Sequence, residues 1–310
     1  MSCLDELYEQ FPVRNTAEQK KNFRNWAAAQ AEKSGWTVRE EENEEHINLV
    51  IGDPERAKLM FTAHYDTPRR SFLPNVLLPA NKTLKTLYTF GVLLPMLAVA
   101  VGAALLAGQA AGGFGTMTGR MTAMVTYMIL YFALFFLLLR GPANRENKND
   151  NSSGAAAVLD LAARLAGNGS AALILFDDEE KGKKGSKAWT TAHPTLKSGL
   201  LDVNLDCVGN GEHVIVSVPP EAEHDPAWPA LKAALEELDA VILPAGSTAM
   251  NSDQKNFEKG VGICVCLKKK KLYYTPRIHT SRDTIASGET VDCLVGALAS
   301  FAGGAPAQKA

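Results

Sequence analysis

Histidines and acidic residues gather in five short segments of this 310-residue chain. In chain order the segments are His64-Tyr65-Asp66, residues 149–154, residues 177–180, Asp206 and His279. Imidazole and carboxylate groups together form a ligand set that suits zinc, with nickel, cobalt or manganese as substitutes. Carboxylates that lie close together repel each other unless cations neutralise them. These residue types predict a metal site, provided that the fold brings the segments together.

Each segment also has an ordinary structural explanation. A single histidine such as His64 is more often a core or surface residue, Asp150 would serve equally as a helix cap, and residues 177–180 are typical of a solvated turn. These explanations weaken because all five segments lie where a predicted strand ends or a predicted helix begins. In a doubly wound sheet such positions meet at one edge, which is where ligands bind.

The hydrophobic pattern predicts the elements that position these segments. A helix over residues 15–34 begins with a capping box of Asn15 and Glu18 and ends before Gly35. Strands are predicted at 37–41, 47–51, 58–63, 171–176, 203–205, 214–218 and 261–267, and further helices at 153–165, 228–238, 253–259 and 289–301. The alternation predicts an α/β fold with a mostly parallel mixed sheet and helices on both faces.

Two long apolar stretches interrupt this alternation between His64 and Asp150. Residues 84–108 contain one charged residue, Lys85, and residues 121–139 contain none. Each stretch is long enough to cross about 30 Å of hydrocarbon as a helix. A buried core helix rarely stays apolar on every side for this length, so the stretches predict a transmembrane hairpin that contacts membrane lipid.

The charges that flank the stretches predict the orientation of this hairpin. The connecting loop carries one basic residue, Arg120, whereas the outer flanks carry seven: Arg69, Arg70, Lys82, Lys85, Arg140, Arg145 and Lys148. The positive-inside rule then predicts a multi-pass protein of the cell membrane with two spans and its polar domain in the cytoplasm. Five cysteines without metal-site spacing, and an N-terminus without an apolar leader, agree with that compartment.

These boundaries divide the chain into three parts. Residues 1–75 and 141–302 form a discontinuous α/β domain, residues 76–140 form the hairpin, and residues 303–310 form a disordered tail. The hairpin leaves the domain beside His64 and returns beside Asp150, so the predicted metal site is expected to face the membrane. A net charge of −2 gives no basic field, and nucleic acid is therefore not an expected partner.

The five segments, in this order, resemble the motifs of the co-catalytic zinc exopeptidase family. That family includes bacterial leucyl aminopeptidase, glutamate carboxypeptidase and glutaminyl cyclase. The resemblance covers residues 48–67 and 149–299. The matching motifs are Leu59–Thr67, Asp150–Gly154, Phe176–Gly182 with Gly185 and Ser186, Asn204–Gly209, and Ile278–Thr280 with Asp283 and Thr284. The apolar hairpin departs from the soluble members of the family.

The resemblance implies a ligand set with one bridging residue. Asp150 would bridge two zinc ions per chain. His64 and Asp206 would complete the coordination of one ion, and Glu180 and His279 that of the other.

The resemblance implies two further roles beside the metal. Asp66 would accept a hydrogen bond from His64 and so fix the tautomer of that ligand. Glu179 would act as the general base, taking a proton from water and delivering it to the leaving amine.

The expected function is a membrane-anchored, zinc-dependent exopeptidase, specifically an aminopeptidase acting on peptide substrates. Three alternatives stay open: a glutaminyl-cyclase-like transferase working with one zinc, a carboxypeptidase, and a non-catalytic scaffold of the kind that the transferrin receptor represents. The motifs define the hydrolytic centre and leave the side-chain preference and the oligomeric state undecided.

Overall fold

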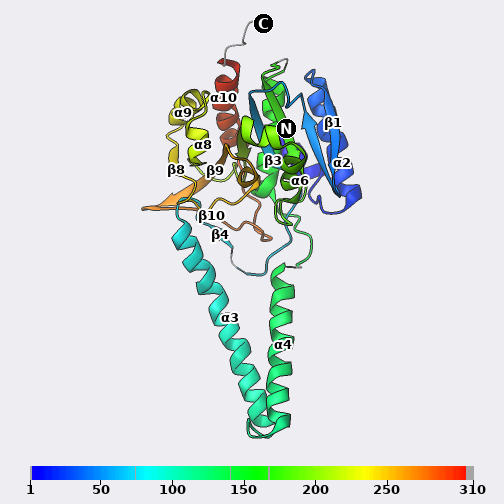
Figure 1. The fold of residues 1–310 in the computed structure, drawn as a ribbon, viewed down its shortest axis with the longest axis vertical. Coiled ribbons are helices and arrows are strands. Elements are labelled where there is room, and N and C mark those ends of the chain that lie inside the picture. Colours follow the sequence, from blue (N-terminus) through cyan, green and yellow to red (C-terminus); the bar gives the residue numbers. More distant parts are fainter. Residues whose placement is uncertain (1, 74, 140, 167, 305–310) are drawn as a thin grey trace.

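A ten-stranded mixed sheet forms the centre of the α/β part of the molecule. The computed structural model describes residues 2–73, 75–139, 141–166 and 168–304 (Figure 1). The strands are β1 (Val38–Asn43), β2 (His46–Ile51), β3 (Leu59–His64), β4 (Val76–Leu77), β5 (Ala171–Phe176), β6 (Leu201–Leu205), β7 (His213–Val218), β8 (Val241–Pro244), β9 (Gly260–Lys269) and β10 (Leu272–Pro276).

Four parallel strands, in the order β5-β3-β6-β9, make up the middle of this sheet. Antiparallel strands extend it on both sides: β2 and β1 beyond β5, β10 and β4 beyond β9. Every residue of β3, β5 and β6 is buried, as expected for central parallel strands that are covered on both faces, although β6 includes the polar residues Asp202 and Asn204. The predicted mixed, mostly parallel α/β fold is confirmed in this central part.

The helices of this domain cover both faces of the sheet. They are α1 (Cys3–Gln10), α2 (Ala17–Lys33), α5 (Gly154–Arg164), α6 (Lys184–Ala192), α7 (Pro194–Gly199), α8 (Pro220–Glu223), α9 (Trp228–Glu236) and α10 (Gly288–Gly304), together with the π-turn η1 (Lys148–Ser153) and the 3-10 turn η2 (Asp253–Asn256).

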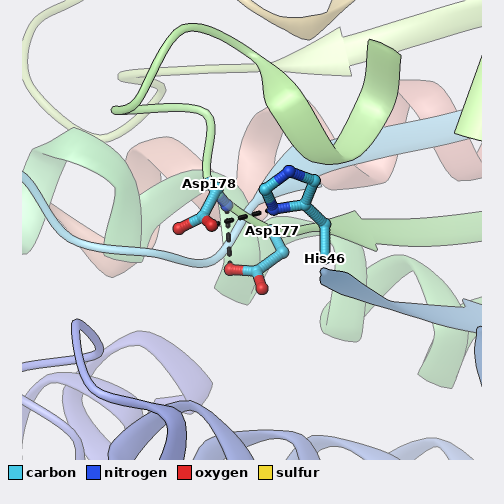
Figure 2. A group of neighbouring side chains, drawn as sticks. All are labelled: His46, Asp177 and Asp178. Atoms are coloured by element: carbon cyan, nitrogen blue, oxygen red, sulfur yellow. Dashed lines mark hydrogen bonds and ion pairs between the residues drawn. The ribbon is translucent and has the colours of Figure 1, made fainter. Parts of the chain in front are cut away.

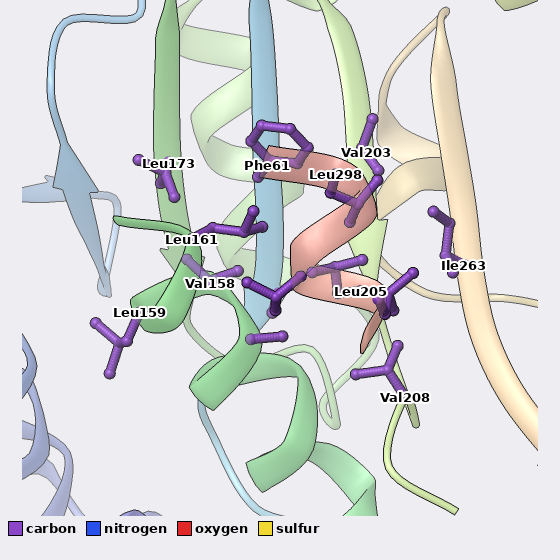
Figure 3. Packing of buried hydrophobic residues seen from close by; sticks show 14 of the residues in the cluster. Phe61, Val158, Leu159, Leu161, Leu173, Val203, Leu205, Val208, Ile263 and Leu298 are labelled. Atoms are coloured by element: carbon purple, nitrogen blue, oxygen red, sulfur yellow. The ribbon is translucent and has the colours of Figure 1, made fainter. Parts of the chain in front are cut away.

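The main core lies between the sheet and helices α5 and α10. Figure 3 shows Phe61 of β3 and Val203 of β6 packed against Val158 of α5 and Leu298 of α10, all of them fully buried. A second core on the other face surrounds the buried indole of Trp189 in α6. Because apolar residues fill both faces, the carboxyl ends of the parallel strands are held in fixed positions relative to one another.

The structure corrects several predicted helix boundaries. Helix α2 begins with a capping box of Thr16 and Gln19, one residue beyond the predicted pair. The predicted helix 253–259 is only the short turn η2, which ends at Asn256. Helix α10 continues to Gly304, so the predicted tail does not begin at residue 303, and the rest of it, 305–310, lies outside the described residues.

Two long helices, α3 (Lys82–Ala110) and α4 (Met117–Leu139), project together from the α/β domain (Figure 1). Both are long and apolar enough to cross a membrane by length and composition. Little of their surface is covered: Leu106 is 74% exposed and Phe136 is 58% exposed. Isolated apolar side chains are common on protein surfaces, but apolar side chains exposed along two whole helices indicate a surface that meets an apolar medium or partner.

The two helices meet at the tip of the hairpin and diverge towards the domain (Figure 1). The residues of α3 that are buried are Ala100, Ala104 and Gly108, spaced four apart. A Cβ atom placed on Gly108 would lie only 2.8 Å from the Cβ atom of Ala123 in α4, so a side chain at this position would collide with α4. The close-packed face of α3 therefore consists of Ala100, Ala104 and Gly108. Gly102 lies outside this face, because no atom comes within 4 Å of the position that its Cβ would occupy.

The base of the hairpin is joined to the sheet. Strand β4 directly precedes α3, and its residue Val76 pairs with Pro276 of β10. The side chain of Asn81 then caps α3 by accepting a hydrogen bond from the N–H of Leu84 at 2.8 Å. The first residues of the predicted hairpin segment thus form an edge of the α/β domain.

Candidate metal centre

The five predicted ligands come from the carboxyl ends of neighbouring elements. His64 is the last residue of β3, Asp206 follows β6, and Glu180 lies four residues after β5. Asp150 belongs to the π-turn η1, where its backbone is not helical, and the peptide bond to Asn151 is cis. His279 follows β10 in a left-handed conformation, with φ of 57°.

The structure brings all five together in two groups that share one residue. His64, Asp150 and Asp206 form one group, and Asp150, Glu180 and His279 form the other. Within each group the ligand atoms lie within 4.8 Å of one another. Asp150 is the residue that these two groups share.

The distances between these atoms fit metal ligands. Nε2 of His64 lies 3.7 Å from Oδ1 of Asp150 and 4.0 Å from Oδ1 of Asp206. Nε2 of His279 lies 3.0 Å from Oδ2 of Asp150 and 3.4 Å from Oε1 of Glu180. Two ligands at the usual zinc distances of about 2.0–2.2 Å stand roughly 3.3 Å apart in a tetrahedron. Both groups are therefore close to the spacing that one ion each would require.

Hydrogen bonding supports the same interpretation. Among the described residues, Nε2 of His64, Oε1 of Glu180 and Oδ1 of Asp206 are buried without a hydrogen-bond partner. Buried polar atoms are rarely left unpaired, and an exception calls for an explanation such as a bound ion. These three atoms belong to predicted ligands, so the chemistry of the donor set fits zinc.

Asp66 lies beside the predicted partner and also contacts a backbone segment. Its Oδ1 lies 3.3 Å from Nδ1 of His64. In addition, Oδ1 accepts from the backbone N–H of Glu179 at 3.0 Å and Oδ2 from that of Glu180 at 3.2 Å. The carboxylate of Asp66 thus holds the segment that carries the predicted base and a predicted ligand.

The backbone around Asp150 is held by side chains of two matching motifs to which the resemblance assigned no role. Asp283 accepts a hydrogen bond from the N–H of Asp150 at 3.0 Å. The Oδ1 atom of Asn151 accepts from the backbone N–H groups of Gly154 and Cys207, at 3.0 and 3.2 Å. The contacts of Asp283 with Asp150 and of Asn151 with Cys207 join segments far apart in the sequence, so the motifs alone do not predict them.

Burial shapes the electrostatics of the centre. It raises the pKa of Glu180 to about 8, and Asp150 adds to that rise. Burial also raises the pKa of Glu179 well above its usual range. For His279, the nearby carboxylates of Glu180 and Asp150 outweigh burial and raise the pKa to about 10. The cluster holds more negative charge than its own residues neutralise, as expected for a cation site.

The family is shown by the sequence of the segment that carries four of the five candidate ligands. Residues 143–293 match the sequence model of peptidase family M28. They form a peptidase family M28 domain. The match confirms the predicted resemblance to the co-catalytic zinc exopeptidases, and it includes Asp150, Glu180, Asp206 and His279. The comparison with curated proteins gave no match.

Solved structures share the fold of the M28 domain and of the rest of the chain. A Zn-dependent exopeptidase from Parabacteroides distasonis has 15% identity and a TM-score of 0.59, with 97% of this chain and 96% of that chain covered. Porphyromonas gingivalis glutaminyl cyclase has 14% identity and a TM-score of 0.58, with the same coverage. A leucine aminopeptidase precursor from Bacteroides thetaiotaomicron has 13% identity and a TM-score of 0.55, covering 98% and 95%.

A second histidine–carboxylate cluster lies beside the centre. Figure 2 shows His46, Asp177 and Asp178, with Nδ1 of His46 2.9 Å from Oδ2 of Asp178. Nζ of Lys20, from α2, lies 2.6 Å from Oδ1 of Asp177 and also contacts Asp178. Lys181 adds a further ion pair to Asp178 at 2.9 Å. Two ammonium groups thus balance the two carboxylates, and this cluster is an ion-pair network of the α/β domain.

The candidate metal centre opens into a cavity of about 360 Å³. Four of the five ligands and Glu179 line this cavity, whereas His64 is buried. The wall also includes Lys183, and Lys85 from helix α3, neither of which the sequence analysis placed near the site. No local sequence pattern links these lysines to the metal motifs. Lys85 lies at the cavity because the pairing of β4 with β10 places the start of α3 beside the segment of His279.

Proposed function

We propose that this protein is a membrane-anchored, zinc-dependent exopeptidase that acts as an aminopeptidase. The observation that carries the proposal is the pair of ligand groups that share Asp150. Each group supplies three protein ligands, as catalytic zinc sites do, so the centre would hold two zinc ions per chain.

Zinc in this centre would lower the pKa of a water molecule and polarise the carbonyl group of the peptide bond. Glu179 lines the same cavity, and its carboxylate lies within 4.8 Å of ligand atoms of His64 and Glu180, which places it for proton transfer at the centre. It would take the proton of the attacking water and deliver it to the leaving amine. Asp66 would keep this side chain in place through the backbone of Glu179.

A glutaminyl-cyclase-like transferase is the second candidate, because proteins of that name share the fold. The resemblance implies one zinc for a cyclase, whereas both ligand groups of this chain are complete. The second group therefore favours the exopeptidase.

Digestion of a peptide library, followed by mass analysis of the products with and without a chelator, tests the proposal. An aminopeptidase releases single residues from the N-terminus, and the activity disappears with the chelator and returns with zinc. Release from the C-terminus would identify a carboxypeptidase, and N-terminal cyclisation with one zinc per chain would identify a transferase. A purified protein that binds no metal and turns over no peptide would be a scaffold.

The proposal includes the membrane because of the exposed apolar surfaces of α3 and α4. Lipid would cover these two helices, and the basic flanks favour a cytoplasmic α/β domain. The cavity of the metal centre is lined in part by the base of the hairpin, so the centre would lie close to the membrane surface. Peptides near the membrane are the substrates that this position favours.

A further inference from the structure

Residues from the base of the hairpin line the cavity of the candidate metal centre. Asn75, Leu77 and Lys85 share this cavity with Asp150 and His279. Lys85 is the fourth residue of α3. The first turn of α3 thus carries the ammonium group of Lys85 to the wall of the candidate active site.

Hydrogen bonds fix Lys85 in this position. Its Nζ donates to the carbonyl oxygen of Val76 at 2.7 Å and to Oδ1 of Asn75 at 3.3 Å. Val76 pairs with Pro276, three residues before His279. The ammonium group is therefore hydrogen-bonded to a strand, β4, that pairs with the segment leading to His279. The pairing of β4 with β10 fixes the position of the ammonium group relative to the metal centre.

The charge of Lys85 has no acidic counterpart. No ion pair among the described residues includes Lys85 or Lys183, and Lys183 donates to the neutral Oδ1 of Asn251 at 3.1 Å. Two divalent ions would cancel the charges of the four carboxylates in the cavity, so the lysines would leave a net positive charge at its wall.

We propose that Lys85 is a specificity residue whose ammonium group binds a carboxylate of a short peptide held at the metal centre. The proposal rests on the proposed function as a peptidase. A cavity of about 360 Å³ is at the small end of the range for ligand sites, which suits a substrate of few residues. In such a substrate the free C-terminal carboxylate lies close to the first peptide bond. A pocket with a fixed cation would therefore select short peptides over long chains.

Binding of three probes tests this proposal in the zinc-loaded Glu179→Gln protein, where turnover does not interfere. The probes are the dipeptide Leu-Gly, its C-terminal amide, and Leu-Asp amide, which carries only a side-chain carboxylate. Leu-Gly should bind roughly tenfold to a hundredfold more tightly than Leu-Gly amide, as expected for a charge-assisted hydrogen bond. Tighter binding of Leu-Asp amide than of Leu-Gly would mean that an acidic side chain is the preferred partner. Equal affinity for all three probes would overturn the proposal without any further variant.

Substitution assigns the selectivity to Lys85. Lys85→Met should abolish the preference for Leu-Gly over its amide, and Lys85→Arg should restore much of it. Lys82→Met is the matched control, because Lys82 lies one turn earlier on α3 and does not line the cavity. It should change the preference by less than about twofold, as an exposed charge does. A preference that survives in Lys85→Met, or an equal loss of affinity for all probes, would overturn the proposal.

The wild-type protein separates this proposal from the proposed function. If Leu-Gly binds with the expected preference but is not hydrolysed, the peptidase assignment fails and the role of Lys85 stands. If peptides are hydrolysed with the same KM whether or not their C-terminus is amidated, the peptidase assignment stands and the role of Lys85 is overturned.

Discussion

Oδ1 of Asp66 accepts a hydrogen bond from the backbone N–H of Glu179 at 3.0 Å. The carboxylate lies two residues beyond the end of β3, and the N–H lies three residues beyond the end of β5, the adjacent parallel strand. Its second oxygen accepts from the N–H of Glu180. One side chain therefore fixes the relative position of the predicted base and a predicted ligand.

Replacement of Asp66 by Asn should impair catalysis more than folding. The amide has nearly the same shape, but it offers one acceptor oxygen where two backbone N–H groups need one each. We expect kcat to fall by about tenfold to a hundredfold, in line with other residues that orient metal ligands. Steady-state kinetics and thermal unfolding would measure the two effects. Asp53→Asn is the control, since Asp53 lies in an exposed turn; an unchanged kcat for Asp66→Asn would contradict the positioning role.

The neighbours Glu179 and Glu180 should respond differently to the same substitution. Glu179→Gln is expected to keep both metals and lose most of kcat, because the proton carrier is gone while the ligands remain. Glu180→Gln is expected to weaken metal binding itself. Metal analysis and kinetics on both variants would separate the roles. Two fully loaded variants with near wild-type rates would show that both assignments are wrong.

The clustering of the candidate ligands could be predicted because strand ends are visible in a sequence. His64, Glu180 and Asp206 each lie at or shortly after the end of a run of apolar residues, and parallel strands bring such ends to one edge. The resemblance included Asp283 in a motif, but its hydrogen bond with the backbone N–H of Asp150 could not be predicted. Lys20 was not predictable, because it lies in a helix, where its spacing resembles that of any solvated lysine.

The position of Lys85 shows a second limit of sequence analysis. Strand β4 has two residues, too few for a periodic pattern, and its partner β10 lies about two hundred residues later in the chain. The start of α2 was misplaced by one residue for a related reason: Asn15 with Glu18 and Thr16 with Gln19 both have capping-box spacing. Tertiary contacts decide between such alternatives.

Lys20 should be important for stability. Its ammonium group is buried between the carboxylates of Asp177 and Asp178. Lys20→Met leaves these buried charges with only His46 and Lys181, so we expect a loss of about 3–5 kcal/mol in the free energy of unfolding. Lys21→Met, at the exposed neighbouring position, should stay within about 0.5 kcal/mol of the wild type. Denaturant unfolding of both variants would measure the difference, and equal stability would mean that the network is unimportant.

The orientation of the hairpin can be tested by labelling. In a cysteine-free background, a cysteine introduced within residues 112–119 should react with an impermeant thiol reagent added outside intact cells. Cys293, restored alone on the exposed surface of α10, should react only after the cells are opened. The reverse pattern would place the α/β domain on the outer side.

The hairpin should also decide which substrates reach the metal centre. Its base lines the cavity, so the bilayer that would surround α3 and α4 lies next to the site of cleavage. Confinement to this layer raises the effective concentration of membrane-bound peptides relative to soluble ones. Peptides anchored to lipid should therefore be cleaved faster than their soluble counterparts.

Replacement of residues 88–138 by a flexible Gly/Ser linker tests this effect and keeps β4, Asn81 and Lys85 in place. The intact and shortened proteins would be compared in the presence of liposomes, on a soluble dipeptide and on the same dipeptide anchored to lipid through the side chain of its second residue, which leaves both termini free. Hydrolysis of the dipeptide should be largely retained, because the ligands and the cavity wall remain, whereas cleavage of the anchored peptide should fall selectively. Equal losses of activity on both substrates would mean that the hairpin only supports the fold. A domain that keeps its metal centre but leaves the membrane should still hydrolyse the soluble dipeptide.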